Sequence, residues 1–234
     1  MNINIMKLFI EIDDRLPASA AAKIRGYMGN LFWEDSYAHQ HDEAGRLIYR
    51  YPRVQYKTLN GGCLLISFEE GREMTAKMFN NITSVNIGGL KEIVSKGIED
   101  YSSPFGISNE HLPYSFLTPW LALNEKNYEQ YQKLGTWAKK KKLLEKILIG
   151  NIISMSKSLG YTVPEPISAN IGKVKEVPAK LKGTPMLGFL GAFSVNFEIP
   201  DYWGIGKSVS RGFGTIKKLQ SAGVKESESL KDME

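Results

Sequence analysis

The sequence predicts an α+β protein built from two similar halves. Strand-type and helix-type patterns alternate along the chain, which is typical of α+β folds. In residues 1–105 these patterns follow the order β-α-β-β-α-β. A length of 234 residues with 42% hydrophobic content is enough for one large or two small domains, and a single cysteine, Cys63, cannot form a disulfide framework within the chain.

The first half begins with a strand, because residues 3–12 alternate apolar and polar side chains. Residues 16–35 predict a helix, since Pro17 suits a first helical turn and the alanines that follow favour helix. The turn signal DEAG at residues 42–45 separates two segments rich in Tyr, Ile and Val, which favour strands.

Another strand follows the hairpin turn Asn60-Gly61-Gly62, within residues 60–71. Residues 72–82 predict a helix, and residues 87–101 predict a strand or a pair of strands. The order of elements is therefore that of a ferredoxin-like (split βαβ) domain.

Residues 102–113 carry turn chemistry and mark the expected domain boundary. The second half then predicts a strand interrupted by Pro119, a helix from residue 124, and a long amphipathic helix that ends near Gly160. Two strands joined by a turn at residues 182–185 follow. We expect two tandem ferredoxin-like (RRM-like) βαββαβ domains, residues 1–105 and 106–220, with a flexible acidic tail at 221–234.

The net charge of +5 and the pI of about 9.1 favour a polyanionic partner. Acidic residues adjoin the first apolar run, which therefore reads as a strand and not as a signal peptide. No stretch reaches the roughly 18 apolar residues of a membrane span. We expect a soluble cytoplasmic protein with no membrane partner.

The glycine-rich stretch DYWGIGKSVSRGFGTIKKL, residues 201–219, is the first candidate site. A phosphate loop of the Walker type is disfavoured by Asp201, and a dinucleotide fingerprint by Val209, because each stands where a glycine is required. The RNA-recognition signature matches over only the four residues 211–214. A surface turn remains open, beside a backbone clamp on nucleic acid in which Lys207 and Arg211 supply charge.

The pair His39 and His41 is the second candidate site, because residues i and i+2 of an extended segment project to the same face. A neutral imidazole and a protonated imidazole could act as base and acid in RNA cleavage. Two alternatives stay open: polar residues of a hairpin, or zinc ligands with Asp42 or Glu43. Cations that could stabilise the phosphate are Lys23, Arg25, Arg50, Arg53 and Lys57.

The chain resembles the repeat-associated mysterious proteins of CRISPR systems, in particular the b subtype of the precursor-RNA-processing Cas-six endoribonucleases. The resemblance is carried by GIGKSVSRGFGTI, by HQHDEAGRLIYRYPRVQYK, by YSFLTPWLALNEKNYEQY and by LLEKILIGNIISMSKSLGY, and it covers most of residues 1–218. Members of this subtype carry a His-x-His pair before a Tyr-Arg-Tyr-Pro strand.

This resemblance implies metal-independent cleavage of CRISPR precursor RNA within the repeat, with no cofactor. His39 and His41 would be catalytic, and Tyr49 and Tyr51 would orient the phosphate or ribose, although core packing equally explains the two tyrosines. Attack by the 2′-OH would leave a 2′,3′-cyclic phosphate (or 3′-phosphate) and a 5′-hydroxyl. The RNA-binding residues would be Gly204, Gly206, Lys207, Ser208, Ser210, Arg211, Gly212 and Gly214, with Lys23, Arg25, Arg50 and Arg53.

The implied partners are CRISPR repeat RNA, a second copy of the chain in a homodimer, and other subunits of the CRISPR interference complex. Two other functions remain open. One is a non-catalytic RNA-binding subunit of the same superfamily, and the other is a metal-dependent nuclease that uses the histidine pair and Asp42.

Overall fold

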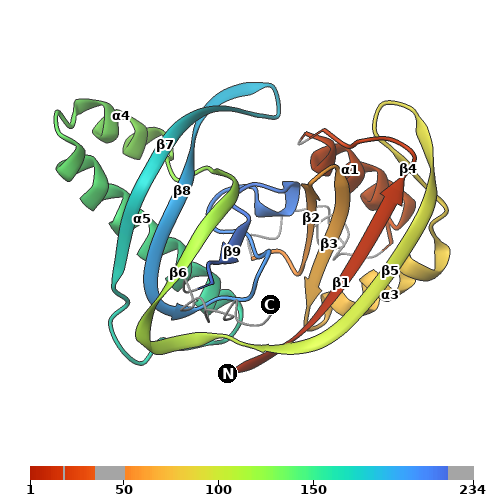
Figure 1. Cartoon of the computed structure of the whole chain (residues 1–234), viewed down its shortest axis with the longest axis horizontal. Helices are drawn as coiled ribbons and strands as arrows, with labels where there is room; N and C mark the ends of the chain where they lie inside the picture. Colours follow the sequence, from red (N-terminus) through yellow and green to blue (C-terminus); the bar gives the residue numbers. More distant parts are fainter. Residues whose placement is uncertain (18, 35–50, 221–234) are drawn as a thin grey trace, which may run out of the picture.

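The structure is a computed structural model that describes residues 1–17, 19–34 and 51–220. The chain forms two α+β domains that lie side by side, each built on an antiparallel sheet (Figure 1). The predicted fold class, two tandem ferredoxin-like domains, is confirmed.

The first domain has a sheet in the order β2-β3-β1-β5-β4. Its strands are β1 (Asn2–Ile12), β2 (Val54–Leu59), β3 (Gly62–Phe68), β4 (Ser84–Asn86) and β5 (Leu90–Pro104). Helices α1 (Ala20–Leu31) and α3 (Gly71–Asn81) bury apolar side chains such as Ile24 and Met78 in one core with Leu8 and Ile10 of β1. The order β2-β3-β1-β5 is the ferredoxin-like order, with β4 added as a short edge strand.

The second domain has a sheet in the order β7-β8-β6-β9, which repeats the same topology. Its elements are β6 (Gly106–Trp120), α4 (Glu125–Lys133), α5 (Trp137–Ser158), β7 (Ala169–Leu181), β8 (Thr184–Glu198), the 3-10 turn η1 (Val209–Arg211) and β9 (Ile216–Lys218). The long helix and the turn at Lys182–Gly183 lie where the sequence predicts them.

The second domain departs from the expected βαββαβ plan at its last crossover. Between β8 and β9, where all residues are described, the chain forms no α-helix but the glycine-rich loop with η1. A helix is disfavoured there because Gly206, Gly212 and Gly214 all adopt positive φ. A loop thus occupies the place of the second helix.

The predicted turn at residues 102–113 is wrong, because β5 continues to Pro104 and β6 begins at Gly106. Gly106, at the start of β6, has a φ of +139° that is open to glycine, and Phe105 is buried beside it. His111, expected in a linker, lies in β6 with its Nδ1 3.5 Å from Ser194 Oγ.

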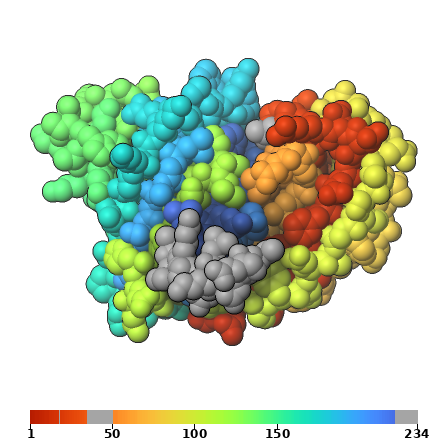
Figure 2. All heavy atoms as spheres, viewed as in Figure 1, coloured from red at the N-terminus to blue at the C-terminus, as the bar shows by residue number. Residues whose placement is uncertain are grey.

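A single aromatic core joins the two domains. The ring of Trp203 lies 4.3 Å from Phe68 of β3 and 5.5 Å from Phe105, centroid to centroid. The segment that carries Trp203 leads directly into the glycine-rich loop, which therefore lies at the junction of the two domains. Figure 2 shows this C-terminal segment, in blue, between them. None of the described helices is long and apolar enough to cross a membrane.

Candidate functional site

The glycines of the loop face the protein interior and allow a very tight packing. A Cβ at Gly204 would lie 2.5 Å from Cβ of Val209, and one at Gly206 would lie 2.6 Å from Nε1 of Trp120. A Cβ at Gly212 would lie 3.0 Å from the side chain of Ala21 in α1. Close approach between backbone and neighbouring side chains thus requires glycine at these positions.

Several amides of the loop are already bonded within the protein. The N–H groups of Gly204, Gly212 and Gly214 donate to Gln55 Oε1, the Val209 carbonyl and the Pro119 carbonyl, at 3.0, 3.1 and 2.9 Å. These three amides do not fit the expected backbone clamp on nucleic acid, because each already donates to an acceptor in the protein. Among the charged side chains of residues 204–214, that of Lys207 is exposed and that of Arg211 is partly exposed.

A buried polar network fixes the loop to β2 of the first domain. Lys57 Nζ donates to Gln55 Oε1 at 2.8 Å and to the Val209 carbonyl at 3.2 Å, and both side chains are fully buried. Burial lowers the pKa of Lys57 to about 7. Lys57 was a candidate cation for a phosphate, but its ammonium group lies inside the protein and holds the loop instead.

The second domain fixes the same loop from the other side. Thr118 of β6 donates its hydroxyl to the Gly212 carbonyl at 2.6 Å and accepts from the Thr215 amide at 2.9 Å. The loop is therefore bonded to both domains, so its shape depends on how the two domains are packed together.

Arg25 of α1 and Arg211 of η1 come together at this junction. Arg25 lies one helical turn beyond Ala21, the residue that meets Gly212. Burial lowers the pKa of Arg25 below its usual value, and the nearby charge of Arg211 lowers it further. Two guanidinium groups so close together repel each other, and a phosphate between them would relieve that repulsion while accepting their hydrogen bonds.

Lys23 and Arg53, two more of the predicted RNA-binding cations, have hydrogen-bond partners within the protein. Lys23 Nζ donates to the Ile87 carbonyl at 2.7 Å. Arg53 pairs with Glu70 at 3.2 Å and donates to the Ser158 carbonyl at 3.2 Å, with a side chain only 12% exposed. These contacts hold elements of the protein together. In the loop itself, Ser210 is buried and Ser208 has a φ of +57°.

Tyr51 supports the loop from inside the protein. Its hydroxyl donates to the Gly204 carbonyl at 2.6 Å, and its ring lies 5.6 Å from Phe68 and 6.0 Å from Trp203. Burial raises the pKa of this hydroxyl well above its usual value. These contacts agree with the core-packing interpretation of Tyr51. His39, His41, Tyr49 and Arg50 lie outside the described residues, as does Asp42 of the metal-site alternative.

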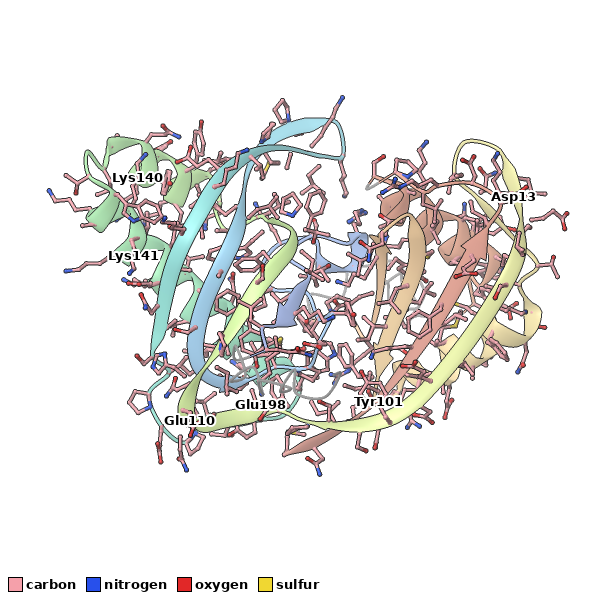
Figure 3. The ribbon with its side chains drawn as sticks, viewed as in Figure 1. Asp13, Tyr101, Glu110, Lys140, Lys141 and Glu198 are labelled. Carbon is pink, nitrogen blue, oxygen red and sulfur yellow. The ribbon has the colours of Figure 1, made fainter. Side chains whose placement is uncertain are left out.

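The run of lysines at the start of α5 is remote from this junction. Lys140 and Lys141 lie at the outer side of the second domain (Figure 3). Lys140 Nζ is 3.9 Å from Glu176, and Lys141 Nζ is 3.7 Å from Glu145 in an i,i+4 pair. This placement fits a solvated helix face.

Sequence reasoning missed Gln55 and Thr118, which bond directly to the loop. Gln55 and Lys57 stand two apart in β2, so both project from one face of an otherwise apolar strand. This pair of polar residues was the only feature of the sequence that could have indicated their role. Their partners are about 150 residues away in the chain, a separation that local patterns do not report.

Comparison with known proteins relates the whole chain to one family. Residues 1–102 match the model of the Cas6b N-terminal domain, and residues 106–219 match that of the Cas6b C-terminal domain. A crystal structure of Cas6b is 35% identical, with a TM-score of 0.86, over 94% of this chain and all of the other. Another, described as the CRISPR RNA processing endoribonuclease Cas6b, is 34% identical, with a TM-score of 0.76 and the same coverage.

Two further similarities are less informative about function. An uncharacterized protein of Methanocaldococcus jannaschii is 44% identical over 141 residues, which are 60% of this chain and 95% of the relative. A Cas6 product complex is 14% identical, with a TM-score of 0.56, over 94% of this chain and 99% of that one. At that identity the likeness shows the fold alone.

Proposed function

Because the chain belongs to the Cas6b family, we propose that it is an endoribonuclease that processes CRISPR precursor RNA by cleaving within the repeat. The observation that carries this proposal is the similarity, over 94% of the chain, to a solved Cas6b described as a CRISPR RNA processing endoribonuclease. The junction between the domains supports it, because Arg25 and Arg211 come together there and can bind a phosphate of an RNA strand.

The proposed chemistry is transesterification by the RNA itself. A neutral imidazole of the pair His39 and His41 removes the proton from a ribose 2′-OH. The 2′ oxygen then attacks the adjacent phosphorus, and the bond to the 5′ oxygen breaks. The other imidazole, which is protonated, donates its proton to the departing 5′ oxygen, so the protons balance over one turnover. The products are a 2′,3′-cyclic phosphate (or 3′-phosphate) and a 5′-hydroxyl, and no metal ion or cofactor takes part.

The proposed substrate contacts involve the charged side chains of the loop more than its amides. Arg211 and Arg25 hold a phosphate at the junction, and the exposed Lys207 adds a third positive charge. Gln55, Lys57, Thr118 and Tyr51 act through protein contacts, because they hold the loop in its shape. Tyr49 and Arg50 stay candidates for contact with the ribose or phosphate.

The test is cleavage of labelled repeat RNA in excess EDTA by the wild type, by His39→Ala, by His41→Ala and by the double variant. We expect cleavage to survive EDTA and to fall by about 10²- to 10⁴-fold when one imidazole is lost. RNA whose scissile 2′-OH is replaced by hydrogen should remain uncut. Loss of cleavage in EDTA would assign the pair to a metal site. Tight binding without cleavage would identify a non-catalytic subunit.

Two further expectations stay predictions. We propose that the protein acts as a homodimer, alone or with other CRISPR subunits, which light scattering with and without RNA would test. We also propose that the domains are residues 1–105 and 106–220, followed by a flexible acidic tail at 221–234. Limited proteolysis should then remove the tail first.

A further inference from the structure

A groove of about 510 Å³ opens on the second domain beside the glycine-rich loop. It lies between α4, α5 and the loop residues Gly206 and Lys207. We propose that this groove binds one unpaired nucleotide of the RNA, with its base against side-chain amides and its phosphate near Lys146 and Lys207. This inference rests on the proposed function, since it assigns a further part of the RNA to the same protein.

Asn151 of α5 presents hydrogen-bond donors to the groove. Its Oδ1 accepts from Nε1 of Trp120 at 3.2 Å, and Trp120 is fully buried. The indole N–H can only donate, so the carbonyl end of the amide must face the tryptophan. The NH₂ group of Asn151 therefore remains available to a ligand, and it suits the carbonyl oxygens and ring nitrogens of nucleobases.

Asn124, on the opposite wall, is oriented in the same way. Its Oδ1 accepts from the amide of Asn127 at 2.8 Å at the start of α4. Its NH₂ group takes no part in this cap, and Asn124, Asn127 and Gln130 all line the groove. Two amides with defined orientation on facing walls can hold the edge of a planar base more selectively than a charged surface can.

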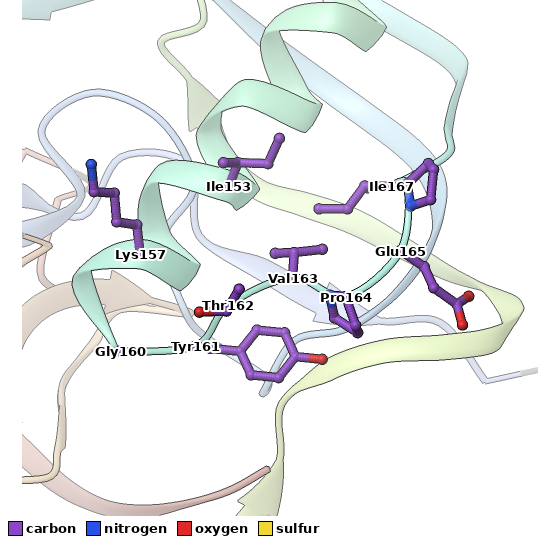
Figure 4. Close-up of a pocket in the computed structure, with 10 residues that line it drawn as sticks. Ile153, Lys157, Gly160, Tyr161, Thr162, Val163, Pro164, Glu165 and Ile167 are labelled. Atoms are coloured by element: carbon purple, nitrogen blue, oxygen red, sulfur yellow. The ribbon is translucent and has the colours of Figure 1, made fainter.

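The charge of the groove favours a phosphate. The described residues that line it include Lys146 and Lys207 and no carboxylate. Three other hollows of the second domain each include a glutamate, among them the larger one between α5 and residues 160–167, where Glu165 lies beside Pro164 (Figure 4). Among these four hollows, the groove beside the loop is therefore the one suited to an anion.

The groove and the glycine-rich loop form one structural unit. Gly206 packs against the indole of Trp120, where a Cβ would lie 2.6 Å from Nε1. The amide of Lys207 donates to the Leu121 carbonyl at 3.4 Å. The same tryptophan thus orients Asn151 and supports the loop, so RNA bound at Arg211 can continue past Lys207 into the groove.

Gly150 offers a test that leaves the fold intact. It lies in α5 on the wall of the groove, and an added Cβ would meet no atom within 4 Å. The variant Gly150→Phe fills the groove, and Gly150→Ala is the matched control. Both should raise helix stability, because glycine is a poor helix former. A second variant, Asn151→Asp, keeps an acceptor for Trp120 but removes the NH₂ donors and adds a negative charge.

The measurement is the fluorescence anisotropy of labelled repeat RNA, with each uridine replaced in turn by 4-thiouridine for cross-linking. We expect Gly150→Phe and Asn151→Asp to weaken binding by about 5- to 30-fold, the loss of one or two hydrogen bonds. Gly150→Ala should bind like the wild type. One 4-thiouridine position should cross-link to α5 in the wild type and lose that cross-link in Gly150→Phe.

Equal affinities for Gly150→Phe, Asn151→Asp and the wild type, with no cross-link to α5, would overturn the inference. Arg211→Ala separates this outcome from failure of the proposed function. If Arg211→Ala weakens binding while the groove variants do not, the protein binds RNA at the junction alone. If the wild type does not bind repeat RNA at all, the proposed function itself is wrong.

Discussion

Replacement of Lys57 by methionine should change how the stability of the protein depends on pH. Lys57 is fully buried, and its pKa falls from 10.5 to about 7 because burial disfavours its charge. Since the folded pKa lies below the unfolded value, the unfolded chain binds more protons between these two pH values. The free energy of unfolding therefore rises with pH in this window. The cost of burying Lys57 is complete below pH 7 and absent above pH 10.5.

The size of the effect follows from the same two values. The difference between 10.5 and about 7, at about 1.4 kcal/mol for each pH unit, amounts to ~5 kcal/mol at and below neutral pH. Lys57→Met removes this cost together with the hydrogen bonds to Gln55 Oε1 and to the Val209 carbonyl, each worth about 0.5–1.5 kcal/mol, while both acceptors keep a second donor in the amides of Gly204 and Gly212. At pH 7 the variant should therefore be at least as stable as the wild type.

Urea unfolding between pH 6.5 and 8.5 measures this directly. The free energy of unfolding should rise more steeply in the wild type than in Lys57→Met, with a difference in slope that approaches about 1.4 kcal/mol per pH unit above pH 7. Cys63, whose pKa burial raises to about 12, is common to both proteins and cancels in the difference. If the two proteins show the same pH dependence and the variant loses several kcal/mol at pH 7, Lys57 is charged and stabilising, and the reasoning is wrong.

Three further predictions concern the loop. Arg25→Ala and Arg211→Ala should each weaken RNA binding and reduce the slope of log K against log salt by about 0.7–0.9; an unchanged slope would argue against phosphate contact. Gly214→Ala should destabilise the fold by more than about 3 kcal/mol, because its Cβ would overlap the Ile205 carbonyl oxygen. Gly183 also has a positive φ, but a Cβ there would meet no atom within 4 Å. Gly183→Ala should therefore lower the free energy of unfolding in urea by only about 1 kcal/mol, and equal losses for the two variants would refute the packing argument. Thr118→Val should cost about 1–3 kcal/mol by the same assay, since Gly212 O and Thr215 N lose a partner, and a neutral result would show that the loop is held without it.

Local patterns were sufficient to predict most of the elements. The helix at Trp137–Ser158 follows from its apolar periodicity, and the hairpin at Lys182–Gly183 from its turn residues. The two long strands that meet at Phe105 were missed because the turn residues of 102–113 suggested a connecting segment. The second domain lacks its second helix because the glycines of the loop pack against residues that are distant in the sequence, and local patterns do not report such contacts.

The candidate site was predicted only in part, for the same reason. The sequence pointed to the glycine-rich loop and to Arg25 and Arg211, which the structure brings together. It could not reveal that Lys57 is a buried support of the loop, since that depends on a contact between β2 and Val209 across most of the chain. Nor could it reveal the groove, because Asn124 and Asn151 line the same groove only after α4 and α5 have packed.

The mass of the 5′ cleavage fragment of repeat RNA, produced in excess EDTA, tests the central claim most directly. Attack by the 2′-OH predicts a fragment that ends in a 2′,3′-cyclic phosphate, or in the 3′-phosphate formed from it, and a second fragment with a 5′-hydroxyl. A 5′ fragment that ends in a 3′-hydroxyl, with a 5′-phosphate on the other product, would contradict the account. Such products require water to attack the phosphorus and the bond from phosphorus to the 3′ oxygen to break.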